Sequence, residues 1–102
     1  MVMTIFRSRL RPENAAEFQA LANRMLEIAK AMPGFISYTS FVSQDGERCS
    51  VIEFDTAEHL RAWREQPEHR RAQQLGRERY YAEYSLYVAE PQRENHFRHE
   101  PG

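Results

Sequence analysis

The chain has 102 residues, and its 14 Lys and Arg nearly balance its 15 Asp and Glu, which leaves a net charge of −1. This length fits one domain. A hydrophobic fraction of 41% and an aromatic fraction of 12% are enough for a folded core and exclude a disordered chain. A nearly balanced charge produces no strong positive electrostatic potential that would attract nucleic acid or an anionic membrane, so we expect neither as a partner.

The single cysteine and the N-terminal residues indicate where the protein works. Cys49 is the only cysteine, so no internal disulfide is possible, and a lone thiol fits the reducing cytoplasm. The first residues lack the basic and apolar regions of a signal peptide. No stretch approaches the roughly 20 apolar residues that a membrane span needs. We therefore expect a cytoplasmic protein.

The first third of the chain predicts a strand and a helix. Residues 2–10 alternate as a strand does. The helix that follows can begin at Pro12, which suits a first helical position, or at Asn14, which could form a capping box with Glu17. The Pro-Gly pair at 33–34 ends it. Its apolar stripe has three- and four-residue spacing and consists of Phe18, Leu21, Ala22, Met25, Ile28, Ala29 and Met32.

The middle of the chain predicts a β-hairpin. Residues 35–43 and 48–55 are rich in β-formers, and the Asp-Gly pair at 45–46 between them is typical of a tight turn. Strict alternation in the first of these strands places Ile36, Tyr38 and Val42 on one side, and Phe35 and Phe41 on the other.

The last third predicts two short helices and a final strand. Thr56 is a natural N-cap for a helix in which Leu60 and Trp63 share a face. Pro67 interrupts that helix and begins a second one, which Gly76 ends. Residues 82–89 alternate as a last strand, so the chain divides into a domain at 1–90 and a polar tail at 91–102.

The element order is β-α-β-β-α-β, which is the ferredoxin-like α+β arrangement. Right-handed crossovers place both helical segments on one face of a four-stranded antiparallel sheet. The strands nevertheless carry apolar residues on both faces, whereas a sheet with one wetted face alternates more cleanly. We therefore expect a homodimer in which a second copy covers the bare face.

Five segments of the sequence resemble one known family: 32–35 (MPGF), 51–54 (VIEF), 60–63 (LRAW), 67–70 (PEHR) and 80–84 (YYAEY). They are similar to the antibiotic biosynthesis monooxygenase domain, a dimeric α+β barrel, over nearly the whole chain except the last dozen residues. The resemblance implies a monooxygenase that needs no metal, flavin or other cofactor. Its substrate would be a small aromatic phenol or quinol, oxidised with dioxygen.

Such chemistry needs an aromatic cavity, a base for the phenolic proton and a donor for the resulting anion. The resemblance points to His69 as the base, to Trp63 as the wall of the cavity and to Tyr38 as a donor. A packing role for Trp63 beside Leu60, and a capping or surface role for His69, are the alternative interpretations.

The remaining candidates are substrate contacts and metal ligands. Arg64 is assigned to the developing anion, and Ile52 and Phe54 of the third predicted strand to the walls of the site. The other histidines, His59, His96 and His99, lack the third and fourth ligands of a metal site, so we expect none.

Three other functions fit the same fold. The domain could be a non-catalytic or stress-related module that binds a small ligand, or an isomerase of a polar metabolite. Haem-degrading relatives carry a histidine about three helical turns after the helix tryptophan and an asparagine in the first strand. Here those positions hold Ala72, Gln73 and Gln74, and Arg7, Ser8 and Arg9, so haem chemistry is disfavoured.

Overall fold

The computed structural model describes residues 1–101. Four strands and three helices follow in the predicted order, with one π-helical turn before the last strand. Their bounds are β1 (Val2–Leu10), α1 (Ala15–Ala31), β2 (Phe35–Val42), β3 (Arg48–Phe54), α2 (Ala57–Glu65), α3 (Pro67–Leu75), η1 (Gly76–Tyr80) and β4 (Tyr81–Ala89).

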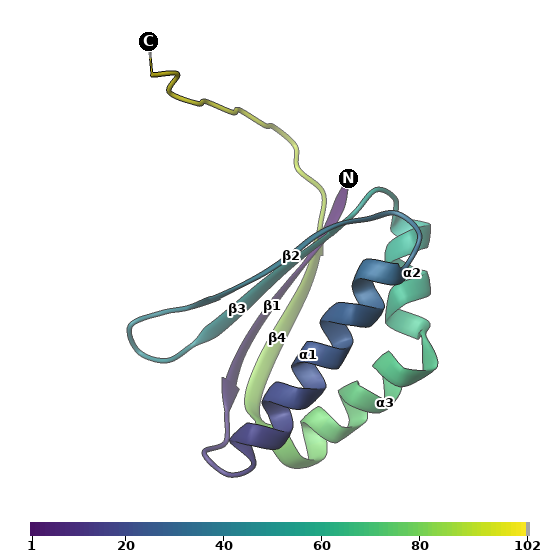
Figure 1. Cartoon of the computed structure of the whole chain (residues 1–102), viewed down its shortest axis with the longest axis vertical. Coiled ribbons are helices and arrows are strands. Elements are labelled where there is room, and N and C mark those ends of the chain that lie inside the picture. Colours follow the sequence, from purple (N-terminus) through teal and green to yellow (C-terminus); the bar gives the residue numbers. More distant parts are fainter. Residues whose placement is uncertain (102) are drawn as a thin grey trace.

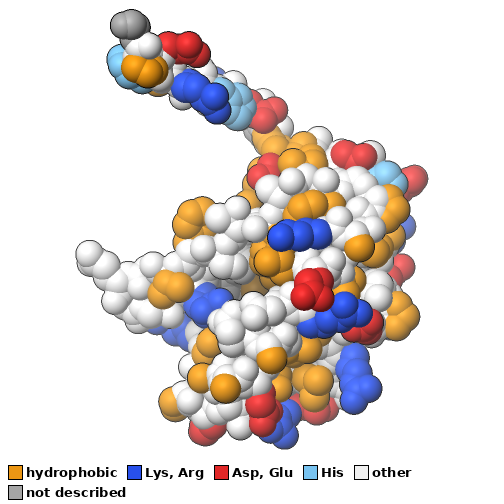
Figure 2. Space-filling view, viewed as in Figure 1, with side chains coloured by type: hydrophobic (Ala, Val, Ile, Leu, Met, Phe, Trp, Pro, Cys, Tyr) orange, Lys and Arg blue, Asp and Glu red, His pale blue; other side chains and the backbone are white. Residues whose placement is uncertain are grey.

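The strands form one antiparallel sheet in the order β2-β3-β1-β4, with the first strand of the chain in its interior. All three helices lie on the same side of this sheet, and the other side is bare (Figure 1). The ferredoxin-like α+β architecture is thereby confirmed. Basic and acidic side chains are interspersed over the face seen in Figure 2, as the balanced charge suggests.

The core lies between the helices and the sheet. Phe54 is fully buried, and Trp63 and Ile52 are 4% and 2% exposed. The predicted stripe of α1 supplies the opposite wall, where Phe18, Met25, Ile28 and Ala29 are buried. No helix among residues 1–101 is long and apolar enough to cross a membrane. Beyond Ala89 the described tail has no helix or strand and runs away from the domain (Figure 1).

The helix starts follow the predicted caps in part. The hydroxyl oxygen of Thr56 accepts a hydrogen bond from the backbone N–H of His59 at 3.1 Å, as expected of an N-cap. Asn14, rather than Pro12, precedes the first turn of α1, but its backbone is left-handed and its side chain makes no capping hydrogen bond. The capping box with Glu17 is therefore absent among the described residues.

A β-bulge in β2 overturns the expected faces of Phe35 and Ile36. The register shifts between Phe35 and Ser37, so Phe35 pairs with Phe54 while Tyr38 pairs with Ile52. Phe35 therefore packs on the core side, and Ile36 is left half exposed. The prediction was wrong because the extra residue inverts the alternation of side chains along the strand.

Gly76 follows the last residue of α3 as predicted, but its backbone conformation differs from that of a usual helix-ending glycine. A glycine that ends a helix usually adopts a left-handed backbone, whereas Gly76 is right-handed, with φ −58° and ψ −48°. The chain continues directly into the π-helical turn η1 instead. A glycine is needed for steric reasons, since a Cβ at this position would lie 2.4 Å from Cε2 of Tyr81.

Substituting Gly76 by alanine is expected to destabilise the protein by about 1–3 kcal/mol, the usual cost of overpacking. The ring of Tyr81 cannot yield freely, because it packs edge-on against Phe6 and Phe18 at 5.3 and 5.8 Å. Urea denaturation measures the change. Helix propensity alone would make the alanine variant more stable, so a gain in stability would contradict the steric explanation.

Candidate functional site

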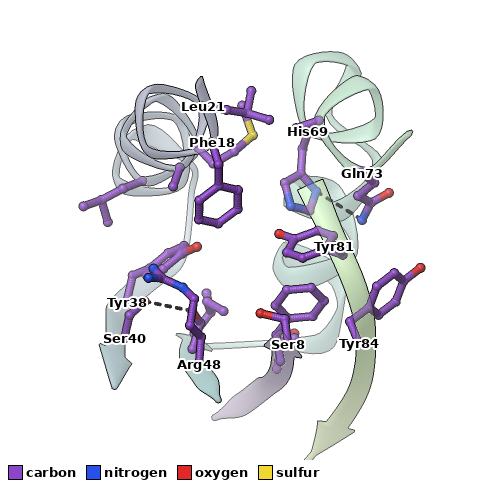
Figure 3. A pocket seen from close by; sticks show the side chains of 18 of the residues that line it. Ser8, Phe18, Leu21, Tyr38, Ser40, Arg48, His69, Gln73, Tyr81 and Tyr84 are labelled. Carbon is purple, nitrogen blue, oxygen red and sulfur yellow. Dashed lines mark hydrogen bonds between the residues drawn. The ribbon is translucent and has the colours of Figure 1, made fainter. Parts of the chain in front are cut away.

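A cavity of about 420 Å³ lies between the helix layer and the sheet. This volume is within the range of about 300–1,000 Å³ that is usual for small-molecule sites. Side chains from α1 and α3 line it from above, and all four strands contribute to its floor (Figure 3). Much of the lining is apolar or aromatic, which suits an aromatic ligand.

Trp63 and His69 form one wall of this cavity. Their rings are 4.1 Å apart and inclined by 31°. The break at Pro67 makes this contact possible, because it ends α2 and lets α3 turn back over Trp63. The amide oxygen of Gln66 accepts a hydrogen bond from the backbone N–H of His69 at 2.9 Å, which caps α3.

The imidazole of His69 is held through its Nδ1. Its Nδ1 lies 3.3 Å from the carbonyl oxygen of Arg64, which can only accept, so this contact favours the tautomer that carries the proton on Nδ1. The amide nitrogen of Gln73 is also 3.5 Å from Nδ1. Nε2 has no hydrogen-bond partner among residues 1–101 and is free to act as a base, and the ring points into the cavity (Figure 3). Burial lowers the pKa of His69, so the neutral form prevails at neutral pH.

Two tyrosines face the same cavity as proton donors. Burial raises the pKa of Tyr38, and burial together with the nearby Tyr38 phenol raises the pKa of Tyr81 to about 12. Both phenols therefore stay protonated at neutral pH. The ring of Tyr38 also meets Trp63 edge-on, with centroids 6.2 Å apart.

The structure brings most of the predicted site residues together. His69, Trp63, Tyr38, Arg64 and Ile52 line the cavity. Phe54 lies outside the lining, fully buried and stacked on Trp63 at 5.7 Å. Outside the cavity, His59 pairs with Asp55 at 2.6 Å. Residues 1–101 contain no group of three or more His, Cys, Asp or Glu that could hold a metal ion.

Sequence reasoning did not select three cavity residues, Tyr81, Gln73 and Arg48. Tyr81 follows the π-helical turn, and no sequence pattern announces such a turn. Gln73 could have been predicted as a site residue, because it lies four residues after His69 and therefore on the same helix face. Arg48 could also have been predicted, because the alternation of side chains along β3 places it on the same face as Ser50 and Ile52.

Comparisons with known proteins agree with this fold. A family model described as antibiotic biosynthesis monooxygenase matches residues 1–75. The uncharacterized protein YqjZ of Bacillus subtilis is 31% identical over 91 residues, which cover 89% of this chain and 80% of that protein.

Many solved structures share the fold, among them the following two. Rv0793 from Mycobacterium tuberculosis superposes with a TM-score of 0.80 at 24% identity, covering 91% of this chain and 96% of that one. SnoaB, a cofactor-independent oxygenase from Streptomyces nogalater, superposes with a TM-score of 0.70 at 19% identity, covering 89% and 94%. Identities this low show the fold alone.

Proposed function

Because the chain belongs to the antibiotic biosynthesis monooxygenase family, we propose that it is a cofactor-independent monooxygenase that oxidises a small aromatic phenol or quinol with dioxygen. The observation that carries this proposal is the neutral imidazole of His69, packed against Trp63 inside an aromatic cavity. The similarity in fold to SnoaB, a cofactor-independent oxygenase, supports it.

The reaction assigns one task to each group. Nε2 of His69 takes the phenolic proton, and the electron-rich anion then reduces dioxygen directly. In a hydroxyanthrone, the CH₂ carbon combines with dioxygen and gives a ketone and one molecule of water. The phenols of Tyr38 and Tyr81 donate to the oxyanion, because their raised pKa values keep them protonated.

Trp63 has a structural cost that a purely apolar residue would avoid. Its Nε1 is buried and has no hydrogen-bond partner among residues 1–101. A buried unpaired donor costs about 1–3 kcal/mol of desolvation. The indole packs between Phe54 and His69, so its role in the proposed site is to position the imidazole at the cavity wall.

The bare face of the sheet supports a homodimer, the typical state of this family. Ile5 pairs with Val51 on one side and Tyr87 on the other, so the three form a row across that face. Tyr87 is 53% exposed and Phe41, on the same face, is 57% exposed. A second copy would cover these apolar side chains and close the α+β barrel.

Replacing Tyr87 by arginine is expected to convert the dimer into monomers, because it would bury a charge in the interface without a partner. Light scattering coupled to size exclusion measures the mass. Val88→Arg is the matched control, since Val88 is about equally exposed, at 51%, on the opposite face of β4. A wild-type protein that is already monomeric would refute the proposed dimer.

We also place the protein in the cytoplasm. Cys49 is a free, half-buried thiol on the bare face of the sheet. Free thiols persist in reducing compartments, and the dimer would shield this one. Fractionation of cells that produce the protein from its own gene tests the location.

Dioxygen uptake tests the proposed activity. Metal-stripped protein is mixed with a panel of quinols and hydroxyanthrones in an oxygen electrode, against buffer and against heat-denatured protein. Uptake well above the spontaneous rate is expected for at least one compound. If uptake never exceeds buffer while the compounds still quench the fluorescence of Trp63, the domain is a binding module instead.

A further inference from the structure

The charged residues of the cavity are all of one sign. Among the residues that line it are Arg48, Arg64 and Arg77, and not one Asp or Glu. The chain as a whole has slightly more acidic than basic residues, 15 against 14. Burial keeps His69 neutral, so it adds no charge. The cavity is thus selectively cationic, which favours an anionic ligand.

Arg48 differs from the other half-buried arginines. Arg11 donates to three carbonyl oxygens, those of Arg77, Glu78 and Tyr81, at 2.9 to 3.1 Å. Arg9 pairs with Asp45 at 2.8 Å. Arg48 has neither a hydrogen-bond acceptor nor a carboxylate partner among residues 1–101. A half-buried guanidinium without an acceptor in its own protein points to an acceptor from outside.

The surroundings of Arg48 shape an anion subsite. Its guanidinium carbon lies 5.3 Å from the ring centroid of Phe18, a contact that holds the group in place over the ring. Ser8 is its direct partner across β1 and β3, so the Ser8 hydroxyl lies on the same face. Figure 3 shows Arg48 on the sheet side of the cavity and His69 on the helix side.

We propose that Arg48 binds a carboxylate on the substrate, so that the natural substrates are aromatic acids. This inference rests on the proposed function, because it names the substrate class of the same cavity. A guanidinium fork matches a planar carboxylate with two parallel hydrogen bonds. One cation neutralises one such charge, whereas a phosphate dianion would need a second inward cation, and Arg64 and Arg77 are exposed. Arg48 then orients the aromatic ring toward Trp63 and His69.

The test compares two ligands of nearly equal shape, 3-hydroxy-2-naphthoic acid and its neutral amide. Calorimetric titration at neutral pH without dioxygen measures binding and leaves turnover out. We expect wild type to bind the acid about 10- to 100-fold more tightly than the amide, the usual effect of a charge-assisted hydrogen bond. Arg48→Gln should lose this preference while still binding the amide, and Arg48→Lys should keep part of it.

Arg61→Gln is the matched control, because Arg61 is exposed on α2 and outside the cavity lining. It should bind both ligands as wild type does. Equal affinity of wild type for acid and amide would overturn the subsite. So would an Arg48→Gln variant that keeps the acid preference, or one that loses both ligands equally.

The two proposals fail separately. If the acid preference depends on Arg48 but no quinol drives dioxygen uptake, the carboxylate subsite stands and the oxygenase proposal falls. If neutral quinols are oxidised and the acid gains nothing from Arg48, the oxygenase stands and the subsite falls.

Discussion

Replacing His69 by glutamine is expected to lower the rate of dioxygen uptake by about 10²- to 10⁴-fold, the usual contribution of a general base. Glutamine keeps a polar side chain at this position, but it cannot accept the phenolic proton. The variant should fold as wild type does, because His69 is neutral and its replacement leaves no charged partner unpaired. The rate is measured with the best quinol of the panel at saturating concentration.

The pH profile adds a second test of His69. Burial lowers its pKa below the usual 6.5, and the reaction needs the neutral form. Uptake should therefore rise with pH through that lowered pKa and be level by neutral pH. His59→Gln is the control, since His59 pairs with Asp55 away from the cavity and should keep the full rate and profile. A His69→Gln variant as fast as wild type would remove His69 from the mechanism.

Replacing Phe54 by alanine is expected to lower the free energy of unfolding by about 3–5 kcal/mol, a large fraction of the stability of a small domain. Phe54 is fully buried, stacks on Trp63 and meets Phe35 edge-on at 5.9 Å. Its removal leaves a void directly behind the wall of the cavity. Urea denaturation at one fixed protein concentration measures the loss.

Two controls separate packing by Phe54 from substrate contact. Phe97→Ala, at a tail residue that is 88% exposed, should change stability by less than about 0.5 kcal/mol. Phe54→Leu keeps most of the buried volume and should bind ligand nearly as wild type does. If Phe54→Leu is stable yet loses the ligand, Phe54 touches the substrate and the packing interpretation is wrong.

The sequence by itself determined the element order and most element boundaries. Apolar periodicity identified α1, the Asp-Gly turn identified the β2–β3 hairpin, and the Thr56 cap and Pro67 break divided the later helices. These signals are local, since each depends on residues within a few positions of one another. The right-handed crossover rule then placed the helices on one face of the sheet, and that placement is also observed (Figure 1).

The candidate site was predictable only in part. Trp63, His69 and Tyr38 came from a family resemblance, and the cavity does bring them together. Residue types alone did not distinguish them from packing residues. Phe54 was assigned to the wall of the site, but it lies outside the cavity lining and stacks on Trp63.

Only the tertiary structure decided which neighbours these residues meet. The bulge at Ile36 turned Phe35 into the core, because one extra residue inverts a strand's faces without a mark in its composition. The break at Pro67 packed His69 against Trp63, and this burial lowers the pKa of His69. Contacts between distant segments likewise left Arg48 half-buried at the cavity without an acceptor among residues 1–101. Burial and pairing are set by contacts between distant segments, and local sequence patterns do not encode those distances.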